Sequence, residues 1–194
     1  GVEAAARASR TIAVLPFENL GTDPADAVLA LAVPESTLDR LAALNGLHVI
    51  ARNSAFRAGR EDRPAREIGE RLGAGWLVEG SVQRVGDRVR VAARLVDARA
   101  DAQVWSERYE RPLAELPALQ DELAARLADA LATRLSGLQR VAEPGAYSRS
   151  VEANLAFMRG RALLDRSTVA ESDAAARQFE EAIARDARFA AAHA

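Results

Sequence analysis

The chain has 194 residues, of which 49% are hydrophobic and 28% charged, and its formal net charge is −2 at pH 7. These values are ordinary for a globular protein of one or two domains, and the weak negative charge disfavours a chain dominated by attraction to polyanions such as nucleic acid. Cysteine is absent, which excludes disulfides and cysteine metal sites. No apolar run approaches the roughly 20 residues that span a bilayer, so we expect no membrane insertion.

The first elements predicted are a tether, a strand and a helix. Residues 1–10 are rich in Ala and Arg without an apolar face, which indicates a tether or a frayed helix. Residues 11–17 are short, apolar and β-branched, as is typical of a strand buried on both faces. A helix should follow, but Pro34 lacks an amide hydrogen and its ring clashes with the preceding turn. We therefore expect the helix to break or restart with Pro34 in its first turn, and to end at Asn45-Gly46.

A second strand and a second helix come next. Residues 47–51 have the apolar, β-branched composition of a strand. Residues 52–63 are polar and rich in arginine. Asp62 can cap a short helix over residues 63–72, which should stop at Gly73.

Residues 78–111 contain two tight turns between runs of alternating hydrophobicity, the pattern of a three-strand antiparallel meander. Gly86-Asp87 supplies the positive φ that a twisted two-residue hairpin needs. In the middle run, four apolar residues point one way while three arginines point the other. The apolar set is Val89, Val91, Ala93 and Leu95; the arginines are Arg88, Arg90 and Arg94.

A leucine stripe follows the meander, with six leucines at intervals of three or four residues, which is the strongest helix signal in the chain. They are Leu116, Leu119, Leu123, Leu127, Leu131 and Leu135. We expect this helix to cover the apolar face of the meander.

The pattern lapses between Ser136 and Ser150, so we interpret residues 138–150 as a linker and residues 11–137 as one α/β domain. Two helical runs then form a hairpin over residues 151–194. The second run carries a small–aromatic–small spacing at Ala175, Phe179 and Ala182 that is typical of the second tetratricopeptide helix, and Gly160 stands where the first helix needs a close approach. One repeat is too short for a self-standing stack, so we expect a truncated array.

The segments 11–20, 66–73, 79–91 and 105–111, read in that order, resemble a bacterial module related to the amino-terminal domain of TolB. The resemblance covers about residues 10–137 and implies an α/β (α+β) fold with a mixed sheet. In that family the module often follows an adenylate cyclase, a serine/threonine kinase or a winged-helix DNA-binding domain, commonly after a membrane span, and precedes tetratricopeptide repeats. The order of segments in this chain matches that arrangement.

No catalytic, cofactor-binding or metal-binding constellation is apparent. His48 and His193 lack acidic partners at a ligand spacing. Glu79 and Glu107 could stand as paired carboxylates, but the arginines of the meander favour cross-strand ion pairs instead. Trp105 and Tyr109 could stack on a ligand, although aromatic residues under a leucine-rich helix are more often core. The candidate partner-facing residues are Arg88, Arg90, Arg94, Phe157 and Phe179.

These observations favour a non-catalytic sensory and protein-interaction region of a larger bacterial signalling protein, linked to an adenylate cyclase, a kinase or a transcription regulator. Its repeat surface would hold a protein or peptide partner, and the exposed faces of the hairpin would favour a homodimer through residues 151–194. The alternative is a nucleic-acid or nucleotide-binding module that uses the arginine-lined sheet face. The resemblance favours the periplasmic side of a membrane-anchored parent, with the cytoplasm as the alternative.

Overall fold

The computed structural model describes residues 2–135, 139–140, 150–164 and 169–186, and it is a mixed α/β fold, as the sequence predicts. Its sheet has the strand order β4-β1-β5-β6-β7, with β2 added beside β5. β1 runs parallel to β4 and β5, and β2 runs parallel to β5, whereas β5, β6 and β7 are antiparallel. The strands are β1 (Thr11–Val14), β2 (Glu18–Asn19), β4 (His48–Val49), β5 (Trp76–Val85), β6 (Arg88–Asp97) and β7 (Ala102–Pro112).

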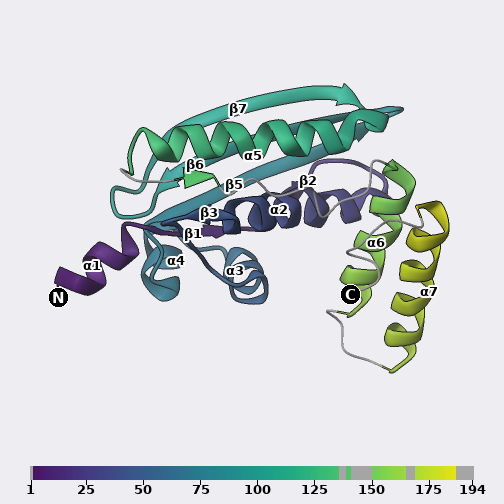
Figure 1. The fold of residues 1–194 in the computed structure, drawn as a ribbon, viewed down its shortest axis with the longest axis horizontal. Coiled ribbons are helices and arrows are strands. Elements are labelled where there is room, and N and C mark those ends of the chain that lie inside the picture. Colours follow the sequence, from purple (N-terminus) through teal and green to yellow (C-terminus); the bar gives the residue numbers. More distant parts are fainter. Residues whose placement is uncertain (1, 136–138, 141–149, 165–168, 187–194) are drawn as a thin grey trace.

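Helices cover both faces of this sheet (Figure 1). α2 (Ala27–Ala42) and α5 (Leu116–Ala132) share one core cluster with residues of β1, β5 and β6. α3 (Arg52–Gly59) and α4 (Ala65–Leu72) build a second, smaller cluster against the opposite face. The exposed helix α1 (Val2–Ala8) precedes β1, and short 3-10 turns (Pro24–Asp26 and Leu113–Glu115) lead into α2 and α5.

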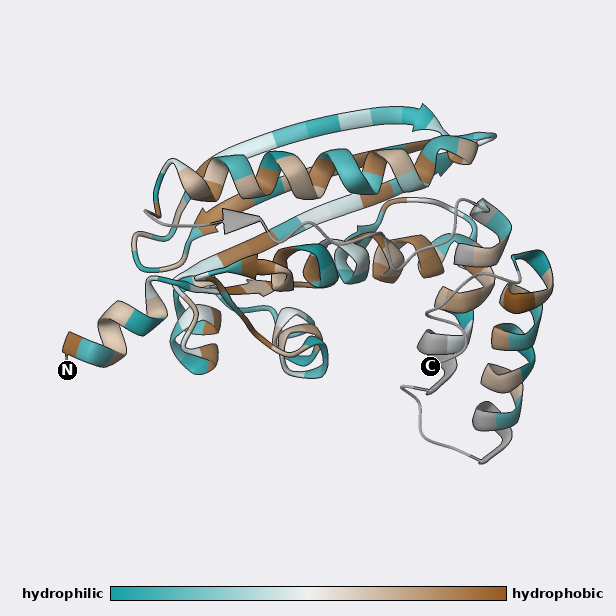
Figure 2. Cartoon of the chain, viewed as in Figure 1, coloured by the Kyte–Doolittle hydropathy of each residue, from teal (hydrophilic) through white to brown (hydrophobic). Residues whose placement is uncertain are grey.

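The meander is confirmed. Gly86 has a φ of 62° in the turn between β5 and β6, the left-handed conformation that a glycine adopts without strain. Burial alternates along β6: the four apolar residues named above are at most 3% exposed, while its three arginines are exposed. β7 is drawn mainly in hydrophilic colours in Figure 2. The meander therefore has an apolar face toward the helices α2 and α5, and its opposite face is polar where α3 and α4 do not cover the sheet.

The leucine stripe is confirmed as the covering element. Five of its leucines lie in α5 and are at most 2% exposed, and Leu135, just beyond the helix, is 8% exposed. Burying such side chains contributes roughly 1.5–3 kcal/mol each before the entropy of the chain is counted. α5 is thus a main part of the core and not a peripheral addition.

The expected break at Pro34 is wrong: α2 runs without interruption from Ala27 to Ala42, with Pro34 inside it. A proline at this position cannot donate to the carbonyl of Ala30, four residues earlier. That carbonyl instead accepts a hydrogen bond from the amide of Phe17, at 3.1 Å, from the loop after β1. The free acceptor that the proline creates is therefore satisfied by another segment, and the helix continues.

Five local boundaries differ from the sequence prediction, and the first is that of β1, which ends at Val14 and not at Phe17. α2 ends at Ala42 and not at Asn45-Gly46, although Gly46 does take a positive φ of 86°. α4 begins after Pro64 and has no side-chain cap from Asp62, because Pro64 already fixes the extended entry to the helix. The second strand contracts to His48–Val49. The arginine-rich stretch contains α3, whose inward side consists of Ala55, Phe56 and Ala58.

Two further helices, α6 (Val151–Leu164) and α7 (Val169–Arg185), form a hairpin beside α2 (Figure 1). The predicted close approach at Gly160 is present, since a Cβ atom there would lie 2.6 Å from the ring of Phe179. Ala32 of α2 is buried in one cluster with residues of α6 and with Ala182 of α7. The α2 helix therefore covers part of the hairpin surface that the sequence leaves open.

The predicted linker 138–150 lies mostly outside the described residues. Within it, Gln139–Arg140 forms the short strand β8, which pairs antiparallel with β3 (Leu44–Asn45). Among the described residues, no helix has the combination of length and apolarity that a bilayer span requires.

Candidate interaction surface

The polar face of the meander carries the three arginines that the sequence singles out, and the structure brings them together with two glutamates. Arg94 Nε lies 2.7 Å from Glu79 Oε2 across β5 and β6. Arg88 and Arg90 each place Nε 3.0 Å from an oxygen of Glu110 on β7. The predicted cross-strand ion pairs are confirmed, and all five side chains remain between 22% and 54% exposed.

These pairs set the chemistry of the surface. Hydrogen bonds from Arg88 and then from Arg90 hold the pKa of Glu110 below its ordinary value of 4.5. Exposed ion pairs of this kind contribute little to stability, because water screens them. Their arginines can consequently exchange an internal glutamate for a carboxylate on a partner at little cost.

Glu79 and Glu107 do not form paired carboxylates, because they lie on opposite faces of the sheet. Glu107 is opposite Ala93 on β6, a core-facing residue, whereas Glu79 is opposite Arg94 on the polar face. Glu107 accepts a hydrogen bond from the hydroxyl of Tyr109 at 2.5 Å and lies 3.8 Å from Arg126 of α5. The side-chain alternation of β-strands decides this outcome.

Tyr109 is core, as favoured from the sequence, with 6% exposure under α5. Burial, and then the hydrogen bond to Glu107, raise the pKa of its hydroxyl. Trp105 is partly buried against the same cluster. The ring of Tyr109 therefore offers no open face for stacking on a ligand.

The two aromatic residues proposed for partner binding lie inside the hairpin contact. The rings of Phe157 and Phe179 are 5.6 Å apart between centroids. Phe157 is only 5% exposed, because α7 and α2 cover it, so a partner could not reach it in this arrangement. Phe179 is half-buried.

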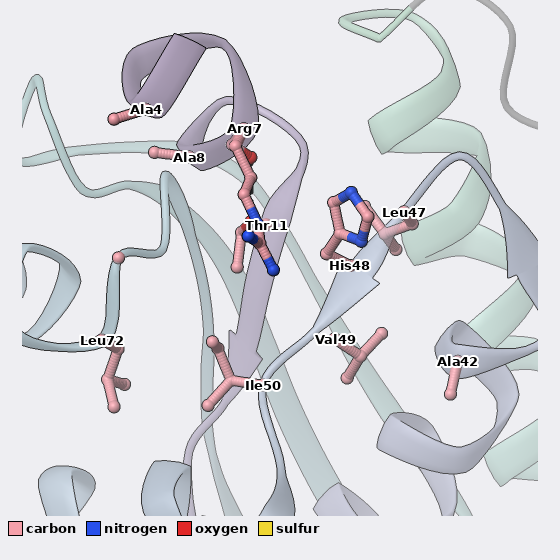
Figure 3. A pocket seen from close by; sticks show the side chains of 11 residues that line it. Ala4, Arg7, Ala8, Thr11, Ala42, Leu47, His48, Val49, Ile50 and Leu72 are labelled. Atoms are coloured by element: carbon pink, nitrogen blue, oxygen red, sulfur yellow. Dashed lines mark hydrogen bonds between the residues drawn. The ribbon is translucent and has the colours of Figure 1, made fainter. Parts of the chain in front are cut away.

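A surface pocket of about 660 Å³ lies over the edge strand β4, next to α1 (Figure 3). Arg7 and His48 stand at neighbouring positions around it, and the other lining residues are small or aliphatic apart from Thr11. His48 is exposed. Within the described ranges, no group of three or more His, Cys, Asp or Glu side chains is arranged to hold a metal ion. His193 lies outside those ranges.

One buried feature escapes the sequence prediction. Glu35, in the middle of α2, is 2% exposed and lies 3.1 Å from Nε of Arg52 at the start of α3. The guanidinium of Arg52 also stands 4.7 Å above the ring of Phe56. The polar run Glu35-Ser36-Thr37 within an apolar helix is the only trace in the sequence of this contact. The contact between Glu35 and Arg52 joins α2 and α3, which lie on the two sides of the sheet.

By sequence, the chain is related to a curated bacterial protein. No protein-family model matches the chain. The chain is 32% identical over 187 residues to a protein of Rhizobium meliloti (strain 1021) that carries the name "Putative adenylate cyclase 3". This match covers 96% of the chain but spans only about a third, 32%, of the length of the relative.

Solved structures that resemble the chain include lipoprotein GNA1162 of Neisseria meningitidis, with a TM-score of 0.47 and 19% identity, covering 62% of this chain and 97% of that one. TolB of Acinetobacter baumannii has a TM-score of 0.47 and 15% identity, covering 63% and 28%. PelC of Paraburkholderia phytofirmans has a TM-score of 0.43 and 22% identity, covering 62% and 87%. Similarities this distant do not decide a function.

Proposed function

We propose that the chain is a non-catalytic sensory and protein-interaction region of a larger bacterial signalling protein, and that this parent is an adenylate cyclase. The observation that carries the proposal is the match along 96% of the chain to one third of a protein named as such a cyclase. The remaining two thirds of that relative leave room for a separate catalytic part. We place the region on the periplasmic side of a membrane-anchored parent, with the cytoplasm as the alternative.

The arrangement of the polar side chains supports a binding role. On the polar face of the meander, Arg88, Arg90 and Arg94 are engaged with Glu79 and Glu110 in exposed ion pairs, which suits exchange with a charged partner. The hairpin α6–α7 is packed on α2, whose residues also contact α5 and the sheet. A partner that binds the α6–α7 hairpin would therefore act on a helix at the centre of the α/β domain.

The purified 194-residue chain tests the non-catalytic assignment. Incubated with magnesium and ATP, and separately with ester and peptide substrates, it should leave each unchanged by mass spectrometry. Catalysis needs a positioned reactive group and an orienting partner. Turnover that copurifies with the chain and is abolished by one substitution, such as Glu35→Gln or His48→Ala, would contradict the proposal.

The alternative, nucleic-acid or nucleotide binding through Arg88, Arg90 and Arg94, is disfavoured because two glutamates already neutralise much of this charge. A phosphate-driven interaction weakens steeply with salt, since it releases counterions. Fluorescence anisotropy of a labelled oligonucleotide at two salt concentrations separates the two functions. We expect no binding at either concentration, and tight binding that disappears at the higher one would favour the alternative.

A further inference from the structure

The two edges of the sheet differ greatly in length. β4, at one edge, has two residues, whereas β7, at the other, has eleven. No described strand pairs with the outer side of β7, which follows the upper border of the molecule in Figure 1. A long edge strand leaves unpaired amides and carbonyls that can join a further strand.

The charges at the end of β7 have a self-complementary order. Residues 107–111 read Glu-Arg-Tyr-Glu-Arg. If two copies of this strand pair antiparallel about a two-fold axis through Tyr109, Arg108 of each copy lies opposite Glu110 of the other. Glu107 likewise lies opposite Arg111. Opposite charges that face each other across two strands stabilise the pairing.

Other registers of the two paired strands would not place every charge opposite a charge of the other sign. A two-fold axis between antiparallel edge strands is perpendicular to the sheet, so it pairs only residues whose side chains point to the same face. Centring the pair on Glu107, Arg108, Glu110 or Arg111 would place that charge against its own copy. Tyr109 is the one centre among these five residues that gives every charge an opposite partner.

Arg108 gives an independent reason to expect that two copies of β7 pair in this register. It is exposed on the polar face, and among the described residues its side chain has no hydrogen-bond or ion-pair partner. The other three charges of the segment are engaged: Glu110 with Arg88 and Arg90, Glu107 with Arg126, and Arg111 with Glu122 at 3.3 Å. A second copy would place Glu110 next to the one charge that the monomer leaves without a counterion.

We infer that β7 is a homodimerisation edge, and that two copies of this chain join through it into one continuous antiparallel sheet centred on Tyr109. The two α5 helices then lie on the same face. Their Glu122 and Arg126 side chains extend the alternating charges on either side of the axis. This interface is separate from the hairpin of residues 151–194.

Paired charge reversals test the inference by sedimentation of the 194-residue chain. The chain itself should be a dimer. Arg108→Glu and Glu110→Arg, each alone, should weaken association by about tenfold or more, because two like-charge pairs replace two opposite ones. An equimolar mixture of the two variants should dimerise again, since each charge then meets its opposite. Arg57→Glu on α3, which makes the same change of charge as Arg108→Glu but away from β7, should leave association unchanged.

Three outcomes would overturn the inference: a monomeric unaltered chain, a dimer that survives both reversals, or two weakened variants whose mixture is no stronger than either alone. Circular dichroism of each variant confirms that it is folded. Restored association in the mixture cannot come from a purely structural effect, because neither variant regains its own lost contacts.

Discussion

At the scale of single residues, Gly80 in β5 has no room for a side chain. A Cβ atom there would lie 2.3 Å from the carbonyl oxygen of Ala92 and 2.7 Å from the ring of Phe17. Because the nearest of these atoms belongs to the backbone of the neighbouring strand, it cannot move aside without disturbing the ladder. The absence of a side chain is therefore what allows the ring of Phe17 to pack against β5 here.

Gly80→Ala should lower the free energy of unfolding by about 1–3 kcal/mol, the usual cost of forcing extra volume into a packed core. Urea denaturation measures it. Ser81→Ala, the next residue on the opposite face, serves as the control and should have little effect. Equal stability of Gly80→Ala and the unaltered chain would show that Phe17 does not pack where the structure places it.

The pair of arginines on Glu110 makes a prediction about pH. The folded pKa of Glu110 is lowered, so the stabilisation from its pairing is fully present above about pH 4.5, its ordinary value, and is lost as the pH falls through the folded pKa. Arg88→Ala removes the larger cause and should move the pKa of Glu110 back toward 4.5. NMR titration of the side-chain carboxyl carbon measures this; Arg57→Ala is the control, and an unchanged pKa would refute the pairing.

At the scale of elements, the leucine pattern of α5 makes a direct prediction about the stability of the fold. Leu127→Ala removes a side chain that is 0% exposed and should cost roughly 2–5 kcal/mol of unfolding free energy. Arg126→Ala, one residue earlier, loses only an exposed contact to Glu107 and should cost less than about 1 kcal/mol. Thermal or urea unfolding of the two variants compares them directly. Similar costs would mean that α5 does not cover the sheet.

Elements with a strong periodic pattern could be predicted from the sequence, and those that depend on distant partners could not. The meander and α5 have alternation or leucine spacing that fixes their type. β2 has only Glu18 and Asn19, and it is a strand because β5 lies beside it. The continuity of α2 through Pro34 depends on the amide of Phe17, which no local rule contains.

The residues of the candidate interaction surface also divide into those that the local pattern predicts and those that depend on distant partners. The arginine row of β6 could be located from alternation alone, and its glutamate partners follow once the register of the meander is known. The burial of Phe157 could not be predicted, because it requires knowing that α6 packs on α2. The Glu35–Arg52 contact likewise joins two helices whose relative position the sequence does not contain.

At the scale of the whole molecule, the contact between the hairpin and α2 determines whether the chain moves as one body. Ala32 is fully buried in that contact, so Ala32→Arg should separate the hairpin from the α/β domain. Small-angle scattering should then show a larger radius of gyration, whereas Ala42→Arg, at the exposed end of the same helix, should not change it. An unchanged radius in Ala32→Arg would mean that α6 and α7 are held by other contacts.

The central claim is that the chain regulates a cyclase without contributing to its chemistry. The most direct measurement is the rate of cyclic AMP synthesis by the full-length gene product, beside that of a version lacking residues 11–194 and shown to be folded. The account predicts that both synthesise cyclic AMP and that their rates differ. Equal rates would contradict a regulatory role, and a folded but inactive shortened protein would contradict the non-catalytic assignment.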